Sequence, residues 1–212
     1  MQPKVLIAGF EPFAGETLNP SWQVARALHG TQLDDEVTIQ AVKLPCIFKQ
    51  SLLCLEQAVN QLQPAVVILL GLAAGCSQLM LEKIASNYID AAIADNAGQQ
   101  PRNALTASHG PAAYFSNLPL NAILQALHLQ HIPAQLSLSA GSYVCNHSFY
   151  GLMHLIKNQY ASIKGGFIHL PYLPGQVLNK PGIASMALET QIEAVKICIE
   201  VSLQQHADQL IA

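Results

Sequence analysis

The chain has 212 residues, of which 51% are hydrophobic and only 11% are charged, and its net charge is −3. It offers no basic surface for nucleic acid, and its longest apolar run, residues 65–74, is shorter than the roughly 20 residues that a membrane span needs. We therefore expect one domain over residues 1–212 that contacts neither nucleic acid nor membrane. The low charge also favours a homo-oligomer that buries apolar surface.

Cysteine usage and the first residues of the chain indicate its compartment. The five cysteines form no Cys-x-x-Cys pair, and residues 1–9 lack the apolar run of a signal peptide. These features predict a cytoplasmic protein without disulfides or a cysteine zinc site. Histidine pairs lack carboxylates at ligand spacing, and the glycine loops at 9–15 and 71–75 match no nucleotide-binding motif, so we expect neither metal nor cofactor.

Strands and helices are expected to alternate along most of the chain. Asn19 followed by Pro20 is typical of a helix start, and the run 66–70 is typical of a strand covered on both faces. The glycine- and asparagine-rich sequence of residues 71–117 predicts only short strands and a long loop. In chain order we expect a strand at 5–8, a helix at 20–29, a strand at 37–44, a helix at 48–62, a strand at 66–70, a helix at 120–129, a strand at 135–139, a helix at 146–158, a strand at 167–170 and a helix at 188–203.

This alternation predicts an α/β fold: a single three-layer α/β/α domain with a largely parallel open sheet. Ligands of such folds bind beyond the carboxyl ends of the strands. Gly9, Gly71, Gly141 and Pro171 follow predicted strands at that edge. Several loops are therefore expected to converge on one site.

Cys145 lies where a predicted strand turns through Gly141 into a predicted helix. Unpaired N–H groups and the dipole at a helix N-terminus favour the thiolate, which is the nucleophilic form of cysteine. The alternative is a buried cysteine without a chemical role, because most free cysteines are of that kind.

Two further side chains could act with this thiol. His169 ends a predicted strand near the same edge, although packing is the commoner role of a strand histidine. Glu82 lies in apolar surroundings, where a carboxylate needs a partner such as a lysine, an arginine or an imidazole. Phe10 and Phe13 in the first loop could belong to the core or sandwich a small flat ligand.

Several motifs occur together in one order: Gly9-Phe-Glu-Pro-Phe13, Asn19-Pro-Ser-Trp22, Gly71-Leu-Ala-Ala-Gly75, Leu81-Glu-Lys-Ile-Ala-Ser-Asn87, Ser139-Ala-Gly-Ser-Tyr-Val-Cys-Asn146 and Gly166-Phe-Ile-His-Leu-Pro-Tyr172. This combination resembles the pyroglutamyl-peptidase I family, also called pyrrolidone-carboxylate peptidases. The resemblance covers most of the chain.

The resemblance implies a cytoplasmic cysteine exopeptidase that hydrolyses the amide bond after an N-terminal pyroglutamyl residue of peptides, through a Cys-His-Glu triad and a thioester. By motif position Cys145 is the nucleophile, His169 the general base and acid, and Glu82 the orienting carboxylate. The family also suggests a dimer or a homotetramer. The residues that the resemblance implies for substrate binding are Phe10, Phe13, Asn19, Leu72, Tyr143 and Val144.

Three positions depart from the family pattern. At one of them, Met80 replaces the usual small hydroxyl residue two before Glu82. Many bacterial members have an arginine where this chain has Cys76, and another, near the active site, where it has Ala92. The departures at Cys76 and Ala92 motivate an alternative function, a catalytically weak or silent pyroglutamyl-peptide binding protein that keeps the lactam pocket. A nucleoside phosphorylase is a third interpretation, which rests on fold analogy alone.

Overall fold

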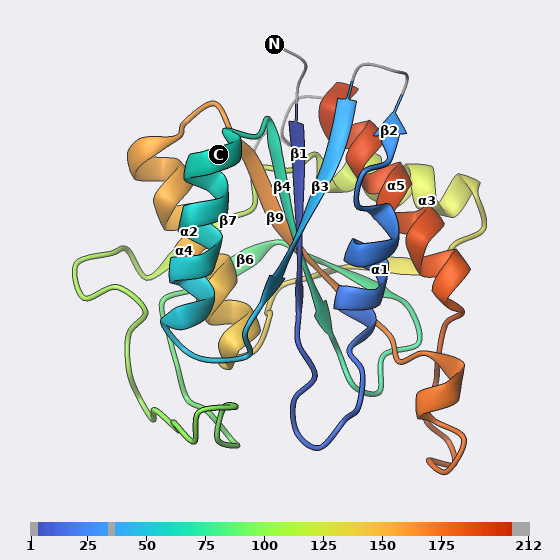
Figure 1. Ribbon diagram of the computed structural model, residues 1–212, viewed down its shortest axis with the longest axis horizontal. Helices are drawn as coiled ribbons and strands as arrows, with labels where there is room; N and C mark the ends of the chain where they lie inside the picture. Colours follow the sequence, from blue (N-terminus) through green and yellow to red (C-terminus); the bar gives the residue numbers. More distant parts are fainter. Residues whose placement is uncertain (1–3, 34–36, 205–212) are drawn as a thin grey trace.

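The computed structural model describes residues 4–33 and 37–204, and shows a seven-stranded sheet between two layers of helices (Figure 1). The expected domain also includes residues 1–3, 34–36 and 205–212, which lie outside the described residues. The elements in chain order are β1 (Lys4–Phe10), α1 (Pro20–Leu28), β2 (Gln32–Leu33), β3 (Val37–Leu44), α2 (Gln50–Leu62), β4 (Val66–Leu72), β5 (Leu79–Glu82), β6 (Ile84–Ser86), β7 (Ala113–Phe115), α3 (Leu120–Leu129), β8 (Ala134–Ser137), α4 (Val144–Gln159), β9 (Lys164–Leu170), the 3-10 turn Pro174–Gln176, and α5 (Leu188–Gln204).

The sheet has the order β2-β3-β1-β4-β9-β5-β8. The three pairings among β3, β1, β4 and β9 are parallel, and so is the pairing of β5 with the edge strand β8. Two pairings are antiparallel: β2 with β3, and β5 with β9. The expected α/β class with a largely parallel sheet is thus confirmed. The short strands β5, β6 and β7 occupy the stretch 71–117, where the sequence predicted them.

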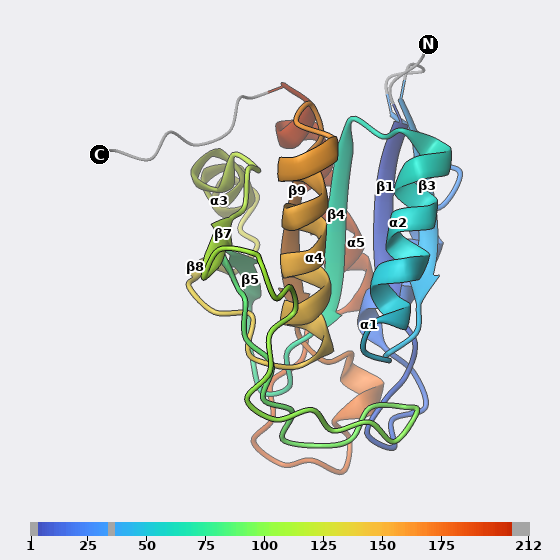
Figure 2. The same cartoon turned by 90° about the vertical axis from the view of Figure 1, so that its left-hand side faces the viewer.

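Helices cover both faces of the sheet and create two cores. Figures 1 and 2 show α2 and α4 side by side on one face, while α1, α3 and α5 pack on the other. All seven residues of β4 are buried, as expected of a central strand covered on both faces. Within the described ranges, no helix combines the length and the apolar character needed to cross a membrane.

The start of α1 packs directly on β1, and Gly9 makes this possible. The helix begins as the sequence predicts, because the Asn19 side chain accepts a hydrogen bond from Ser21 N at 3.1 Å and Pro20 takes the first helical position. A Cβ atom on Gly9 would lie 2.4 Å from Ser21 O. Gly9 therefore lies inside β1 rather than after it, contrary to the expectation, because the strand continues under the helix to Phe10.

Replacing Gly9 by alanine should lower the free energy of unfolding by about 1–3 kcal/mol, since the new methyl group would overlap backbone atoms that cannot swing away. Urea unfolding at one fixed protein concentration measures this as a lower midpoint. Gly175→Ala is the matched control, because nothing lies within 4 Å of its added Cβ, and its effect should stay within about 0.5 kcal/mol. Equal midpoints for the two variants would contradict the close approach.

Candidate active site

A buried hydrogen bond joins the two expected partners of the thiol. His169 Nδ1 lies 2.7 Å from Glu82 Oε1, and the two residues are 7% and 1% exposed. The antiparallel pairing of β5 with β9 sets Glu82 opposite Phe167, whose ring packs on the imidazole with centroids 4.6 Å apart. With Nδ1 facing the carboxylate, Nε2 is the ring nitrogen left for other chemistry.

Glu82 depends strongly on this one contact. Its other oxygen, Oε2, is buried and has no hydrogen-bond partner among the described residues. Because an ionised carboxylate inside a protein needs compensation, the imidazole N–H is its main protein partner. The arrangement therefore fixes the orientation of the ring that the carboxylate holds.

The Cys145 thiol lies beside Gly71, the residue of β4 that is paired with His169. Gly71 lies in β4 directly opposite His169 in β9, and a Cβ atom on it would lie 3.0 Å from Cys145 Sγ and 2.7 Å from Phe167 Cζ. The expectation that Gly71 follows its strand is wrong, because β4 extends to Leu72. A glycine inside the strand leaves room for the thiol beside the imidazole.

The N-terminus of α4 affects the Cys145 thiol less than the sequence suggested. Cys145 is the second residue of the helix, where backbone N–H groups have no acceptor within the helix. Burial nevertheless raises the pKa of the Cys145 thiol, the nearby Cys46 and Glu82 raise it further, and only the cysteine's own backbone N–H lowers it. These surroundings favour the neutral thiol and oppose the thiolate that the helix start favours.

The first turn of α4 is anchored to the end of β6, which lies about 60 residues earlier in the chain. Asn146 Oδ1 accepts a hydrogen bond from Ser86 N at 3.0 Å, and its Nδ2 donates to Ser86 O at 2.9 Å and to Tyr88 O at 3.1 Å. Asn146 is 1% exposed. A buried asparagine beside the candidate nucleophile therefore fixes the helix start. The sequence analysis did not single out Asn146, and its position directly after Cys145 was the one feature that could have drawn attention to it.

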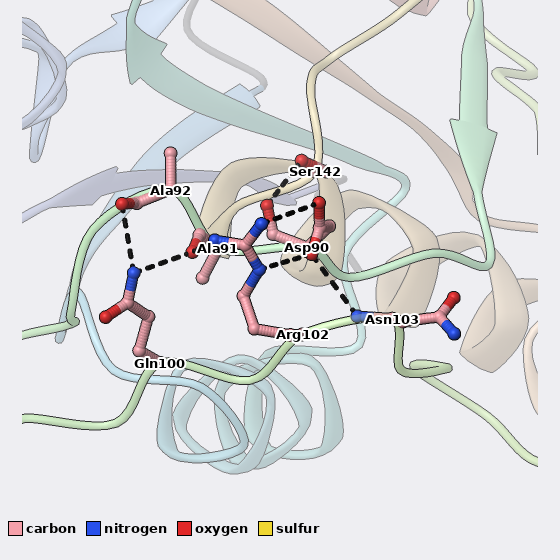
Figure 3. A network of polar contacts seen from close by, with 7 residues as sticks. All are labelled: Asp90, Ala91, Ala92, Gln100, Arg102, Asn103 and Ser142. Atoms are coloured by element: carbon pink, nitrogen blue, oxygen red, sulfur yellow. Dashed lines mark hydrogen bonds and ion pairs between the residues drawn. The ribbon is translucent and has the colours of Figure 1, made fainter.

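Ser142, three residues before Cys145, is bonded to Asp90 in both directions (Figure 3). Asp90 N donates to Ser142 O at 3.1 Å, and Ser142 Oγ donates to Asp90 O at 3.0 Å. The turn from Asp90 to Ala92 is in turn held by Arg102 and Gln100. The exposed Ala92 contributes its carbonyl group to this network, which the sequence analysis did not foresee.

The two phenylalanines of the first loop lie in different surroundings. Phe10 is 2% exposed, and its ring centroid is 6.4 Å from that of Phe167. Phe13 is partly exposed and packs on Tyr143, with centroids 6.0 Å apart, and Tyr143 also contacts Phe48. Phe13 and Tyr143 together form an accessible aromatic wall, whereas Phe10 supports the catalytic candidates from within the core.

The remaining residues implied for substrate binding serve the framework. Asn19 is buried, caps α1, and donates from Nδ2 to Glu11 O at 3.1 Å, so it orders the first loop. Leu72 ends β4 and is almost fully buried. Val144 is completely buried at the first position of α4. Any contact of these three with a ligand would therefore run mainly through backbone groups.

The first loop is also tied to the segment after β9. Glu16 accepts hydrogen bonds from Tyr172 Oη at 3.4 Å and Gln176 Nε2 at 3.2 Å, and pairs with Lys180. The Lys180 ammonium holds the pKa of the Glu16 carboxyl below its usual value. Two loops that are more than 150 residues apart in sequence thus lie together at the same edge of the sheet.

Other polar candidates have structural partners. His147 is buried, accepts a hydrogen bond from Lys49 N at 3.1 Å and contacts Thr106 Oγ1; burial lowers the pKa of His147 to about 4. Cys76 is partly buried in the loop before β5, where burial raises the pKa of its thiol and the Glu82 charge adds to the rise. A separate cavity of about 500 Å³ between α2 and α4 is lined by other residues, among them Leu52, Tyr150 and His154.

Comparisons with known proteins agree with these observations. A family model described as pyroglutamyl peptidase matches residues 3–205. Pyrrolidone-carboxylate peptidase 2 of Photorhabdus laumondii is 46% identical over 207 residues, covering 98% of this chain and 94% of its own, and a Klebsiella pneumoniae pyrrolidone-carboxylate peptidase is 48% identical over 204 residues, with 96% and 94% covered.

Solved structures give the same result. The crystal structure of pyroglutamyl peptidase I from Bacillus amyloliquefaciens superposes with a TM-score of 0.94 at 39% identity, covering 100% of both chains. A mutant pyrrolidone carboxyl peptidase from the hyperthermophile Pyrococcus furiosus gives 0.92 at 39% identity, with 95% and 98% covered. The matches confirm the resemblance seen in the motifs and give no support to the interpretation as a nucleoside phosphorylase. The chain is a member of the pyroglutamyl peptidase family.

Proposed function

We propose that this chain is a cysteine exopeptidase that removes an N-terminal pyroglutamyl residue from peptides, with Cys145 as nucleophile, His169 as general base and acid, and Glu82 as the carboxylate that orients the imidazole. One observation carries the proposal: the buried Glu82–His169 hydrogen bond of 2.7 Å lies beside Gly71, against which the Cys145 thiol packs. A nucleophile, a base and a group that orients the base are the minimal set for acyl transfer.

Acylation would begin from the neutral thiol. As Cys145 Sγ attacks the scissile carbonyl carbon, its proton moves to His169 Nε2, and Glu82 stabilises the imidazolium through Nδ1–H. The negative charge on the carbonyl oxygen would be met by the backbone N–H groups at the start of α4. When the C–N bond breaks, His169 returns the proton to the leaving amine and a thioester remains.

Deacylation would reverse the roles of the same groups. A water molecule loses a proton to His169 Nε2 as its oxygen attacks the thioester carbon. The C–S bond then breaks, the proton passes to Cys145 Sγ, and pyroglutamic acid leaves. No group beyond the chain and water takes part in this cycle.

Specificity would come from the shape and polarity of the lactam. The accessible rings of Phe13 and Tyr143 offer flat apolar surface, with Phe10 behind them in the core. Backbone groups near Leu72 could pair with the lactam N–H and C=O. A prolyl substrate lacks the ring carbonyl, so a donor would lose its bond at a cost of about 1–3 kcal/mol.

The homo-oligomer and the cytoplasmic setting remain predictions. Leu129, Leu138 and Leu178 are all strongly exposed, which supports the view that the single chain has apolar surface available to another copy. All five cysteines are free thiols, in keeping with a reducing compartment.

Cys145→Ala and His169→Ala should each reduce hydrolysis of a fluorogenic pyroglutamyl amide by at least about a thousandfold, because each removes a member of the proposed triad. His109→Ala, at an exposed histidine, is the control and should retain full activity. Substantial turnover by either triad variant would overturn the assignment. Tight binding of pyroglutamate without turnover by the unmodified chain would instead support the alternative binding protein.

Alkylation of Cys145 by iodoacetamide should accelerate continuously from pH 6 to pH 9, because burial raises the pKa of the thiol and the reactive thiolate stays a minor form throughout. Mass spectrometry of the Cys145 peptide, in a Cys76→Ser background, measures the rate at each pH. A plateau reached below pH 8 would show a preformed thiolate and contradict the resting state described above.

Gly71→Ala should lower kcat by about a hundredfold, since the new methyl group would lie 3.0 Å from Cys145 Sγ and displace the thiol or the Phe167 ring. The same amide assay measures the effect, with Gly175→Ala as the control. Unchanged kcat in a folded Gly71→Ala protein would mean that the thiol does not react from this position.

A further inference from the structure

The backbone turn that precedes Cys145 is hydrogen-bonded to the irregular segment 90–94. Residues 90–94 receive hydrogen bonds from two consecutive residues of this turn: Ser142 Oγ donates to Asp90 O, and Tyr143 Oη donates to Ala94 O, each at 3.0 Å. Ala92 is exposed and Ile93 is 45% exposed, so neither side chain fixes the segment in the core. The middle of the segment is held by Ala91, which is completely buried and whose N–H donates to Pro101 O, and by Gln100, which donates to Ala91 O and Ala92 O.

Arg102 holds this segment from outside. Its Nε donates to Asp90 Oδ1 at 2.6 Å, its Nη2 reaches Asp90 Oδ2 at 3.4 Å, and its Nη1 donates to Ala91 O at 3.3 Å (Figure 3). A planar guanidinium that grips both carboxylate oxygens and a neighbouring carbonyl fixes orientation as well as distance. Asn103 N also donates to Asp90 Oδ1, at 3.3 Å.

We propose that Arg102, acting through Asp90 and Ser142, is a positioning residue for the Cys145 nucleophile. The chain of contacts runs from the guanidinium to the Asp90 carboxylate, through the Asp90 backbone to Ser142, and along three residues to Cys145. Gly141 precedes Ser142 with a φ of +80°, so the turn has a hinge on its other side. Displacement of Ser142 therefore moves the backbone N–H groups and the thiol at the start of α4.

This role differs from that of an ordinary surface ion pair. The Arg102 and Asp90 side chains are 61% and 32% exposed, and pairs of this kind contribute little to the free energy of unfolding. Catalysis is far more sensitive, because a displacement of about 1 Å can cost a hundredfold in rate. Arg102 is thus expected to affect turnover without affecting global stability.

The proposal rests on the proposed peptidase function, but its first test does not. Hydrogen exchange followed by mass spectrometry should show about tenfold faster exchange for residues 141–146 in Arg102→Met, with an unchanged urea midpoint. Arg26→Met, at the only other arginine of the chain and also exposed, is the matched control and should leave this exchange unchanged. Unchanged exchange in Arg102→Met, or a midpoint that falls with it, would overturn the positioning role.

Turnover of the pyroglutamyl amide supplies the second test. Arg102→Met and Asp90→Asn should each lower kcat about tenfold with little change in KM, and the double variant should lose no more than either single one. Losses that multiply would overturn the route through Asp90. Arg102→Lys should remain well below the unmodified chain, and full activity would show that charge alone suffices.

The two proposals fail in different ways. If the unmodified chain has no turnover, the peptidase function fails, while the exchange of residues 141–146 still decides whether Arg102 positions the turn. If turnover is normal and Arg102→Met matches Arg26→Met in both measurements, only the positioning role fails.

Discussion

The site depends on a buried carboxylate that has one hydrogen-bond partner among the residues that the structure describes. Glu82 is 1% exposed, and its hydrogen bond to His169 is its main compensation for leaving water. The two side chains can meet only because β5 runs antiparallel to β9, in a sheet whose centre is otherwise parallel. The antiparallel pair therefore carries the buried hydrogen bond, and the thiol lies beside Gly71, which is paired with His169.

The thiol is subject to two opposing effects. The helix start favours its ionised form, whereas burial and the neighbouring Cys46 and Glu82 raise its pKa and favour the neutral form. Under the proposed mechanism a neutral thiol needs a base at the moment of attack, so the orientation of His169 matters more than it would for a standing thiolate. Accurate placement of Cys145 then becomes the main demand on the surrounding loops.

Local patterns predicted much of the fold but less of the site. Hydrophobic periodicity marked the central strands and the helices, and Asn19 with Pro20 marked the start of α1. The sequence around β5 does not predict the direction of this strand, because a run of four residues does not show which strand it pairs with. The bond between Ser142 and Asp90 joins residues 52 positions apart, and the Cys145 thiol for which Gly71 leaves room is more distant still in sequence. The residues alone made Glu82, His169 and Cys145 candidates, and the resemblance to a family gave the three their roles as a set.

The order of strands has a consequence for synthesis of the protein. β9 lies between β4 and β5, although it is made more than 80 residues after either of them, so the middle of the sheet closes last. Until residue 170 has left the ribosome, β4 has an apolar edge without its neighbour, the kind of edge that invites aggregation. The strand that closes this gap is the one that carries His169. A nascent chain therefore gains the pairings at the middle of its sheet and its candidate base in a single late event.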